Sequence, residues 1–314
     1  ASGSFHSLRT STTFMAVPSR LIALPVEWIH DARHPAPETV IADKAVSFEG
    51  WTPKNSDSEF MGDIPLRTAL QHSRNTVSAQ IAHTVGPARL IQIARAMGVS
   101  EPLNENLSIS LGSCELSPLT MARLYSTVAS GGQARQPLVV TLIESSSGET
   151  LTDNRQVEPT LVFDKDVAAQ LTEMLQRVVT RGTGKAAALG DIPVAGKTGT
   201  TDNSRDAWFV GYTPDVVVGA WVGFDDEEAL HLTGAQAALP MWVEFVRQIM
   251  PAASHDFVMP PAVATREIDP QSSQLATSKC PQRSAEVFIE GTEPSVYCEV
   301  HGSGLWERVK RSFG

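Results

Sequence analysis

The sequence predicts an α/β protein of the α+β kind, in which an antiparallel sheet is flanked by helices. Several segments in the first two thirds of the chain repeat apolar residues at three-and-four spacing, the period of a helix packed on one face. Residues 194–224 instead contain short β-branched and aromatic runs separated by turn residues, as in a strand meander. With 42% hydrophobic residues among 314, the chain can bury a sizeable core.

The helical segments have recognisable starts and stops. The runs "PLRTALQHS" and "TVSAQIAHTVGPARLIQIARAMGV" predict helices, and Gly98 follows the second run as a stop. Ser117 is a good N-cap with Pro118 at the first helical position, and Gly131-Gly132 ends that helix. The run "DKDVAAQLTEMLQRVVTRGTG" predicts a further amphipathic helix that ends at glycine.

Strands and turns dominate elsewhere. The segment "PLVVTLIESSSGETL" predicts a hairpin around Ser147-Gly148. From Val194 onward, "VAGKTGTT", "DAWFVGYTP" and "DVVVGAWVGF" predict antiparallel strands, with turns at 202–204 and 212–215. The run "ALPMWVEFVRQIM" predicts a closing helix, and "EVFIEGTEPSVYCEVHG" predicts a small strand-like tail module.

Charge and hydropathy exclude some function classes. With 25 basic and 35 acidic residues, the net charge is −10, so we expect no nucleic-acid partner. No run reaches the roughly 18 apolar residues of a membrane span, and the start "ASGSFHSLRT" lacks the order of a signal peptide. We therefore expect either a soluble protein or a piece of a longer chain.

The three cysteines favour structural roles. Cys280 and Cys298 lie in one C-terminal segment, so a disulfide between them is one alternative if the compartment is oxidising. Cys114 has no histidine or basic residue close in sequence, which favours an ordinary buried thiol over a nucleophile. We expect no metal site and no cofactor.

The segment "AGKTGTT" has two interpretations. A phosphate-binding loop needs G-x-x-x-x-G-K-[ST] and a helix that starts at the lysine, but Asp191 stands where the first glycine belongs. The turn-forming residues that follow also disfavour a helix. We therefore expect Lys197 on an exposed edge strand, where it holds a carboxylate while the strand pairs with an extended peptide.

A second motif supports the edge-strand interpretation. Lys197-Thr198-Gly199 together with Ser73-Arg74-Asn75, between two predicted helices, is the motif pair of serine β-lactamases and penicillin-binding proteins. With "ETVIADKAVSFEGWTPKN", "LGSCELSPLTMARLYSTVASGG", "RGTGKAAAL" and "DAWFVGYTPDVVVGAWVGFDD" in order, the chain resembles the transpeptidase domain of class A, bifunctional penicillin-binding proteins. The resemblance implies that fold over 35–250, a linker and tail module over 251–314, and a poorly matched segment 1–34.

The resemblance also implies roles for particular residues. Catalytic roles fall to Ser73, which relays a proton to or from the leaving amine, to Asn75, which binds the substrate amide carbonyl, and to Lys197. Lys197 also binds substrate, and the other substrate-binding residues are Thr198, Gly199, Thr200 and Thr201. The implied partners are D-Ala-D-Ala stem peptides and β-lactams, on the outer face of the cytoplasmic membrane or in the periplasm.

One family motif is missing. Acyl-enzyme chemistry in the family needs S-x-x-K, yet no serine of this chain has a lysine three residues later. Ser4 in "GSFH" is a weak substitute nucleophile, with His6 as its base. Three explanations remain: a non-catalytic relative that lost its nucleophile, a different local solution, or a coding-frame error within 1–34. Since full-length relatives also carry a membrane anchor and a glycosyltransferase domain, we expect the chain to be a fragment.

Overall fold

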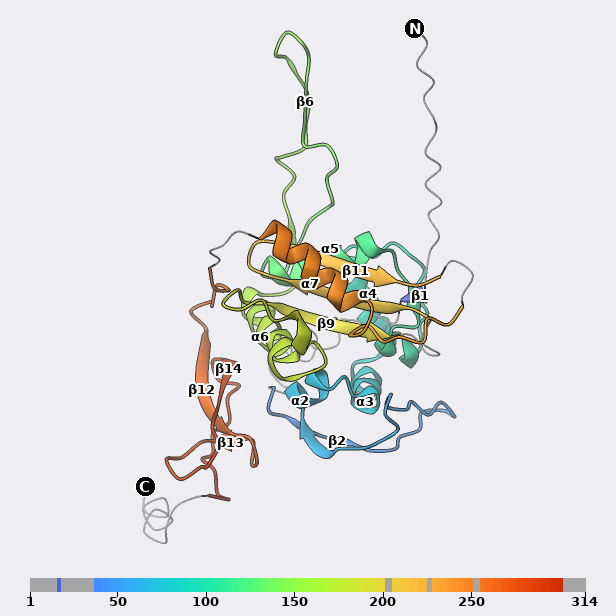
Figure 1. The fold of residues 1–314 in the computed structure, drawn as a ribbon. Coiled ribbons are helices and arrows are strands. Elements are labelled where there is room, and N and C mark those ends of the chain that lie inside the picture. The colour runs from blue at the N-terminus through green and yellow to red at the C-terminus, as the bar shows by residue number, and fades with distance from the viewer. Residues whose placement is uncertain (1–15, 18–36, 201–204, 225–227, 251–254, 302–314) are drawn as a thin grey trace.

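The computed structural model in Figure 1 describes residues 16–17, 37–200, 205–224, 228–250 and 255–301. Its centre is a three-stranded sheet of β9 (Ala195–Thr200), β10 (Ala207–Tyr212) and β11 (Val217–Val222). The order is β11-β10-β9 and both pairs are antiparallel, which confirms the predicted meander. The "AGKTGT" segment is therefore a strand at the edge of this sheet.

The sheet is packed on both faces. Successive side chains of β10 point to opposite faces, because the side chains of a strand repeat with a period of two residues. Trp208, Val210 and Tyr212 belong to the larger apolar core, which contains residues of α5 (Pro118–Ala129) and α6 (Lys165–Arg181). Ala207 and Phe209 belong to a second core with α7 (Ala238–Ile249). The predicted arrangement of helices flanking an antiparallel sheet is confirmed.

The predicted helices all form. Ser117 caps α5 by accepting a hydrogen bond from the Thr120 amide at 3.1 Å. The long apolar run before residue 98 divides at Gly86, whose φ of +88° favours glycine and which precedes a proline at the first helical position. The helices and turns of this part are α2 (Leu66–Gln71), α3 (Asn75–Val85), α4 (Pro87–Ala96) and the 3-10 turns η1 (Leu107–Leu111) and η2 (Lys185–Ala187).

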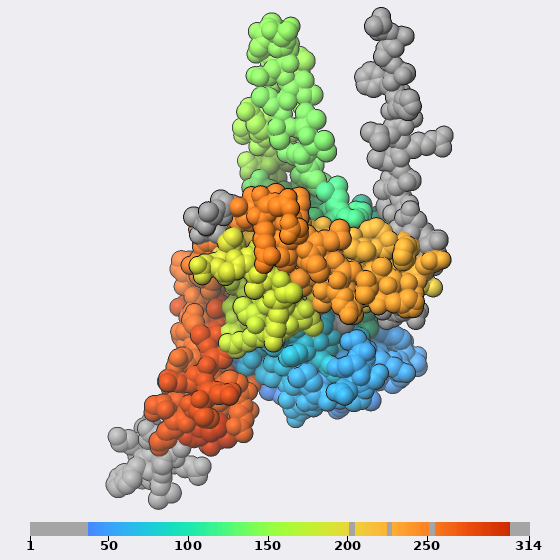
Figure 2. Space-filling view, viewed as in Figure 1, coloured from blue at the N-terminus to red at the C-terminus, as the bar shows by residue number. Residues whose placement is uncertain are grey.

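Short strands complete the body. The predicted hairpin forms from β6 (Leu142–Glu144) and β7 (Thr150–Asp153), and Figures 1 and 2 show it projecting well away from the rest of the molecule. The other short strands pair as β1 (Ala16–Val17) with β4 (Cys114–Glu115), β2 (Val40–Asp43) with β3 (Gly62–Pro65), and β5 (Gln133–Ala134) with β8 (Thr160–Leu161).

The C-terminal module is a second small sheet of β12 (Val263–Asp269), β13 (Gln274–Leu275) and β14 (Ser284–Ile289), in the order β13-β12-β14. The strand-like tail is confirmed, although no sequence pattern indicated β12. The module lies beside α6 (Figure 2). Buried ion pairs join the two parts, since Glu286 of β14 lies 2.8 Å from Arg177 of α6 and 3.6 Å from Arg67 of α2.

All three cysteines are buried free thiols. Because Cys280 and Cys298 are both free, the structure contains no disulfide between them. Cys114 belongs to the large apolar core, as expected of a structural thiol. None of the helices in the described ranges is long and apolar enough to cross a membrane.

Candidate active site

Ser73 occupies a strained turn between α2 and α3. Its φ of +60° lies in the left-handed region, which is unfavourable for a residue other than glycine and is concentrated at functional sites. The turn is held from behind, because the Ser73 amide donates to the Leu70 carbonyl at 3.1 Å and the Arg74 amide donates to the Ala69 carbonyl at 2.9 Å. These backbone hydrogen bonds hold the strained turn in place.

Lys197 and Ser73 meet although 124 positions separate them. The Lys197 Nζ donates to Ser73 Oγ at 2.5 Å and to the Thr198 carbonyl at 3.1 Å. Lys197 pairs with Val210 across the sheet, and the side chains of a directly opposed pair share one face, so the lysine points toward the helices that carry Ser73. The lysine is only 5% exposed, which strengthens its attraction for an anion.

Asn75 begins α3 and is half-buried. Its Nδ2 donates to the Lys54 carbonyl at 2.5 Å, while its Oδ1 is buried and has no hydrogen-bond partner among the described residues. An unpaired buried acceptor is costly and is rare away from functional sites. Asn75 therefore presents an amide whose hydrogen-bonding capacity is only partly used, close to the Ser73 hydroxyl.

A buried carboxylate clamps the residue that follows Ser73. Asp43 is fully buried at the end of β2 and accepts from Arg74 Nε at 2.7 Å, from Asn55 Nδ2 at 2.8 Å and from the hydroxyl of Thr76. Burial alone would raise the pKa of Asp43, but these hydrogen bonds, led by the one from Thr76, hold it below its ordinary value. The carboxylate is charged at neutral pH and fixes Arg74, the central residue of the Ser73-Asn75 motif.

Asn55 completes the clamp. Its Oδ1 accepts from the Asn75 amide at 2.8 Å and from the Thr76 amide at 3.3 Å, so it satisfies two of the amides that a helix start leaves unpaired. Asp57 adds a second carboxylate at 2.6 Å from the Arg74 guanidinium. The segment 43–57 therefore fixes Arg74 and the start of α3, where Asn75 lies.

The two threonines of β9, Thr198 and Thr200, face away from Lys197. Thr198 and Thr200 pair with residues of the α7 face, and their hydroxyls have other partners. Thr198 Oγ1 lies 2.7 Å from Thr183 Oγ1, and Thr200 Oγ1 accepts from the Gly234 amide at 3.0 Å. A ligand that touches Lys197 and both threonines must therefore lie off the open edge of β9, beside Gly199.

The structure thus brings Ser73, Asn75 and Lys197 into one site, with Thr198, Gly199 and Thr200 along its edge. Thr201 and Ser4 were also expected there, but both lie outside the described residues, as does the whole of segment 18–34.

Comparison with known proteins places this geometry in a family. The family description "Penicillin binding protein transpeptidase domain" matches residues 20–238, and "Penicillin-binding protein 1A, C-terminal domain" matches residues 259–303. The chain belongs to the penicillin-binding protein transpeptidase family. The match begins at residue 20, inside the segment 1–34 that the sequence motifs did not cover.

Relatives of this chain are similar in sequence over most of its length. Penicillin-binding protein 1A of Aquifex aeolicus is 36% identical over 253 residues, which is 80% of this chain and 34% of that protein. Among solved structures, penicillin-binding protein 1A of Haemophilus influenzae has a TM-score of 0.77 at 22% identity, covering 91% of this chain and 49% of the other. The chain spans about a third of the length of the curated relatives that it matches.

A third similar protein was solved with a bound ligand. The PonA1 protein of Mycobacterium tuberculosis in complex with penicillin V has a TM-score of 0.70 at 21% identity, covering 79% of this chain and 75% of the other. At this identity the likeness establishes the fold of the penicillin-binding transpeptidases and no more. The fold class implied by the sequence motifs is therefore confirmed.

Sequence reasoning missed several residues of the site. Asp43 and Asn55 stand in the segment "ETVIADKAVSFEGWTPKN", which carried the family resemblance, but nothing in that segment indicated contact with the Ser73 turn. Thr183 in "RGTG" and Gly234 were likewise unassigned. A polar residue directly after a helix-ending glycine, as in Gly182-Thr183, was the one local signal.

Proposed function

We propose that the chain is a peptidoglycan D,D-transpeptidase domain, which cross-links stem peptides through an acyl-enzyme and binds β-lactams at the same site. The observation that carries the proposal is the contact of Lys197 Nζ with Ser73 Oγ at the open edge of β9. An edge strand offers unpaired backbone groups to an extended peptide, and a shielded ammonium beside it suits a terminal carboxylate.

The roles of the residues follow from hydrogen-bond direction. Because Lys197 donates to Ser73 Oγ, that oxygen accepts one proton and still has its own proton to give. In acylation, the nucleophile passes its proton to a base and bonds to the penultimate D-Ala carbonyl carbon, the carbon–nitrogen bond breaks, and Ser73 supplies the proton that the leaving D-Ala amine needs. In transfer, the acceptor amine bonds to the carbonyl carbon and gives a proton to the Ser73 oxygen, while the bond to the nucleophile breaks and the base returns the proton to the nucleophile.

Substrate would be held at both ends of the reacting bond. The ammonium of Lys197 and the hydroxyls of Thr198 and Thr200 bind the terminal carboxylate, and Asn75 donates its amide to the carbonyl of the stem peptide. The Thr200 amide is one of two donors that stabilise the oxyanion. Gly199 and Thr201 line the strand along which the peptide lies.

The wider assignments belong to the same proposal. The site acts on the outer face of the cytoplasmic membrane or in the periplasm, where stem peptides ending in D-Ala-D-Ala are found. The domain occupies residues 35–250, followed by the linker and tail module at 251–314. The proposal assigns to full-length relatives the membrane anchor and the glycosyltransferase domain that the resemblance implies, and this chain spans about a third of the length of one such relative.

A second candidate is favoured by the missing S-x-x-K. A penicillin-binding fold without its serine nucleophile binds stem peptide and penicillin reversibly and performs no acylation. Ser4 is the weak candidate nucleophile of the enzymatic alternative.

Incubation with a fluorescent penicillin, followed by denaturing electrophoresis, separates these two functions, because only a covalent acyl-enzyme survives denaturation. A labelled band supports the transpeptidase, and Ser4→Ala then tests whether Ser4 is the acylated residue. An unlabelled band from folded chain, together with reversible binding in solution, supports the non-catalytic alternative. Folded chain that neither becomes labelled nor binds penicillin contradicts both.

A further inference from the structure

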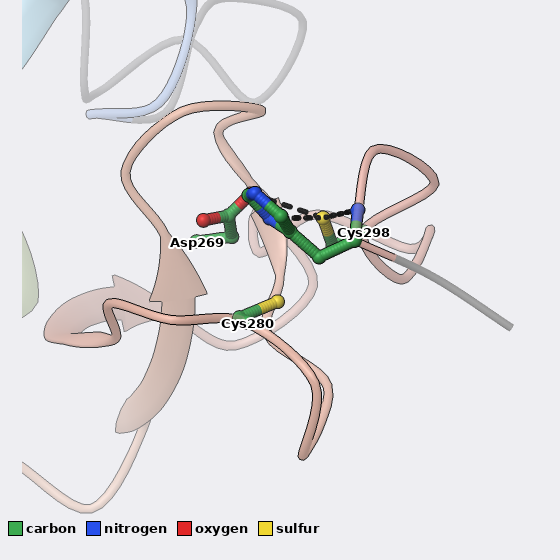
Figure 3. A group of neighbouring side chains, drawn as sticks. Asp269, Cys280 and Cys298 are labelled. Carbon is green, nitrogen blue, oxygen red and sulfur yellow. Dashed lines mark hydrogen bonds and ion pairs between the residues drawn. The ribbon is translucent and has the colours of Figure 1, made fainter.

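The C-terminal module gathers four side chains of the kinds that bind transition metals. Asp269, Cys280, Cys298 and His301 each direct one ligand atom into the same space, and these atoms all lie within 4.8 Å of one another. Asp269 ends β12, Cys280 lies between β13 and β14, and the other two residues follow β14. In Figure 3, Asp269, Cys280 and Cys298 converge from separate stretches of the ribbon.

The group is buried although its members are polar or reactive. Asp269 is 1% exposed, Cys280 6% and Cys298 0%, while His301 is half-buried. Aspartate is almost never fully buried unless it is paired or coordinates a metal. Two of the atoms near Asp269 Oδ2 are themselves ligand atoms of the group, Cys298 Sγ at 3.0 Å and His301 Nδ1 at 3.2 Å.

Backbone amides point at both sulfurs. The Thr277 amide donates to Cys280 Sγ at 3.3 Å, and the His301 amide donates to Cys298 Sγ at 3.3 Å. Burial and the neighbouring Asp269 carboxylate raise the pKa of Cys298, so its thiol donates to Asp269 Oδ2 when no metal is bound, and an incoming metal ion has to displace that proton. On the outside of the group, the Ser272 hydroxyl donates to Asp269 Oδ2 at 2.8 Å, the kind of outer hydrogen bond that orients a ligating carboxylate.

We propose that Asp269, Cys280, Cys298 and His301 form a tetrahedral Zn²⁺ site that ties the C-terminal module together. Two sulfurs and an imidazole suit zinc, whereas Ca²⁺ and Mg²⁺ take oxygen ligands. Ligand atoms at about 2.0–2.3 Å from a zinc ion lie about 3.3–3.8 Å from one another in a tetrahedron, so the observed group has to contract only slightly. Each cysteine releases its proton when the ion binds.

A metal site would stabilise a module whose apolar core is small. Its three strands bury few large apolar residues, chiefly Ile268, Val287 and Phe288, and modules of this size commonly need a metal or disulfides. A zinc ion would join the end of β12, the connection before β14 and the segment after it. This proposal departs from the expectation of no metal, and it excludes the disulfide between Cys280 and Cys298, because both sulfurs are ligands.

The first test uses the unaltered chain. It is purified with reductant from cells supplied with zinc, dialysed against metal-free buffer, and its zinc is measured by mass spectrometry of the element. About one equivalent per chain is expected. Iodoacetamide labelling and peptide mass spectrometry should find Cys280 and Cys298 protected until a chelator is added, while buried Cys114 keeps the same reactivity with and without chelator. Replacement of zinc by Co²⁺ should give the thiolate-to-cobalt charge-transfer bands of a tetrahedral sulfur site.

Variants then locate the ion. Cys280→Ser and His301→Ala should lose at least about nine tenths of the bound zinc, and the matched control Cys114→Ala should keep it. Three results overturn the proposal: no zinc retained by the reduced chain, zinc lost equally from Cys114→Ala, or a Cys280–Cys298 disulfide in chain isolated without reductant from an oxidising compartment. Because labelling and cobalt spectra use the unaltered chain, the test does not depend on whether a variant folds.

Discussion

Replacing Lys197 by alanine tests the central contact of the site. The ammonium donates to Ser73 Oγ at 2.5 Å and is 5% exposed, so a ligand carboxylate beside it makes a charge-assisted hydrogen bond that water screens poorly. Hydrogen bonds to charged groups contribute about 1.5–3 kcal/mol. At about 1.4 kcal/mol for each tenfold change, Lys197→Ala should weaken binding of a carboxylate-bearing β-lactam by about 10- to 150-fold.

The assay compares a β-lactam with its methyl ester, which lacks the negative charge. Affinity is measured by displacement of a fluorescent ligand, or as the second-order acylation rate if a covalent adduct forms. The unaltered chain should prefer the acid, and Lys197→Ala should abolish that preference, since the lysine and the carboxylate are the two partners of a double-mutant cycle. Ser73→Ala should keep the preference, because it removes the proton relay and leaves the ammonium.

Lys185→Ala is the matched control, because Lys185 is an exposed lysine on η2, close in sequence to Thr183. It should change the preference for the acid little, as surface charges are screened. The reasoning is refuted if folded Lys197→Ala still distinguishes acid from ester as the unaltered chain does. It is also refuted if Lys185→Ala loses that distinction to the same extent.

Three further perturbations address the supports of the site. Asp43→Asn leaves buried Arg74 without its buried carboxylate partner and should lower the free energy of unfolding in urea by about 3 kcal/mol, with weaker β-lactam binding. Unchanged stability contradicts the clamp. Gly234→Ala places a Cβ about 2.3 Å from the Trp208 carbonyl oxygen, so β-lactam affinity should fall about tenfold. The control Gly219→Ala, whose Cβ has no atom nearer than 3.8 Å, should leave β-lactam affinity unchanged. Burial raises the pKa of Glu173 to about 7 from 4.5. The stability that the protonated Glu173 contributes is therefore complete below pH 4.5 and is lost as pH rises through 7. The free energy of unfolding in urea should fall accordingly between about pH 4.5 and 8, and Glu173→Gln should lack this fall.

Much of the fold could be predicted because its signals are local. Ser117 and Pro118 specify the start of α5 within two residues, and the hydroxyl does cap the helix. The assignment of "AGKTGT" to a strand rested on residues that disfavour a helix directly after the lysine. These signals depend on neighbouring residues alone, so the elements that they predict also form in the folded protein.

The parts that escaped prediction depend on contacts between distant residues. Nothing around Asp43 indicates that it faces Arg74, 31 positions away, since a buried carboxylate and a solvated one look alike in sequence. Strand β12 was missed because "VATREID" carries exposed charged residues and follows a proline-rich stretch, and only pairing with β14 identifies it as a strand. The same limit hid the four-residue group of Figure 3, whose members are assembled by sheet topology.

The buried charges of the C-terminal module connect it to both sides of the proposed active site. Arg67 lies on α2, which leads directly into the strained turn of Ser73, and Arg177 lies on α6, which ends just before Thr183. Glu286 of β14 is paired with both arginines. Removing one member of such a buried group leaves uncompensated charge, so the elements that carry Ser73 and Thr183 are held in place partly from β14. A change that loosens the module, including loss of its metal, should therefore alter ligand binding at Lys197 without touching any residue of the site.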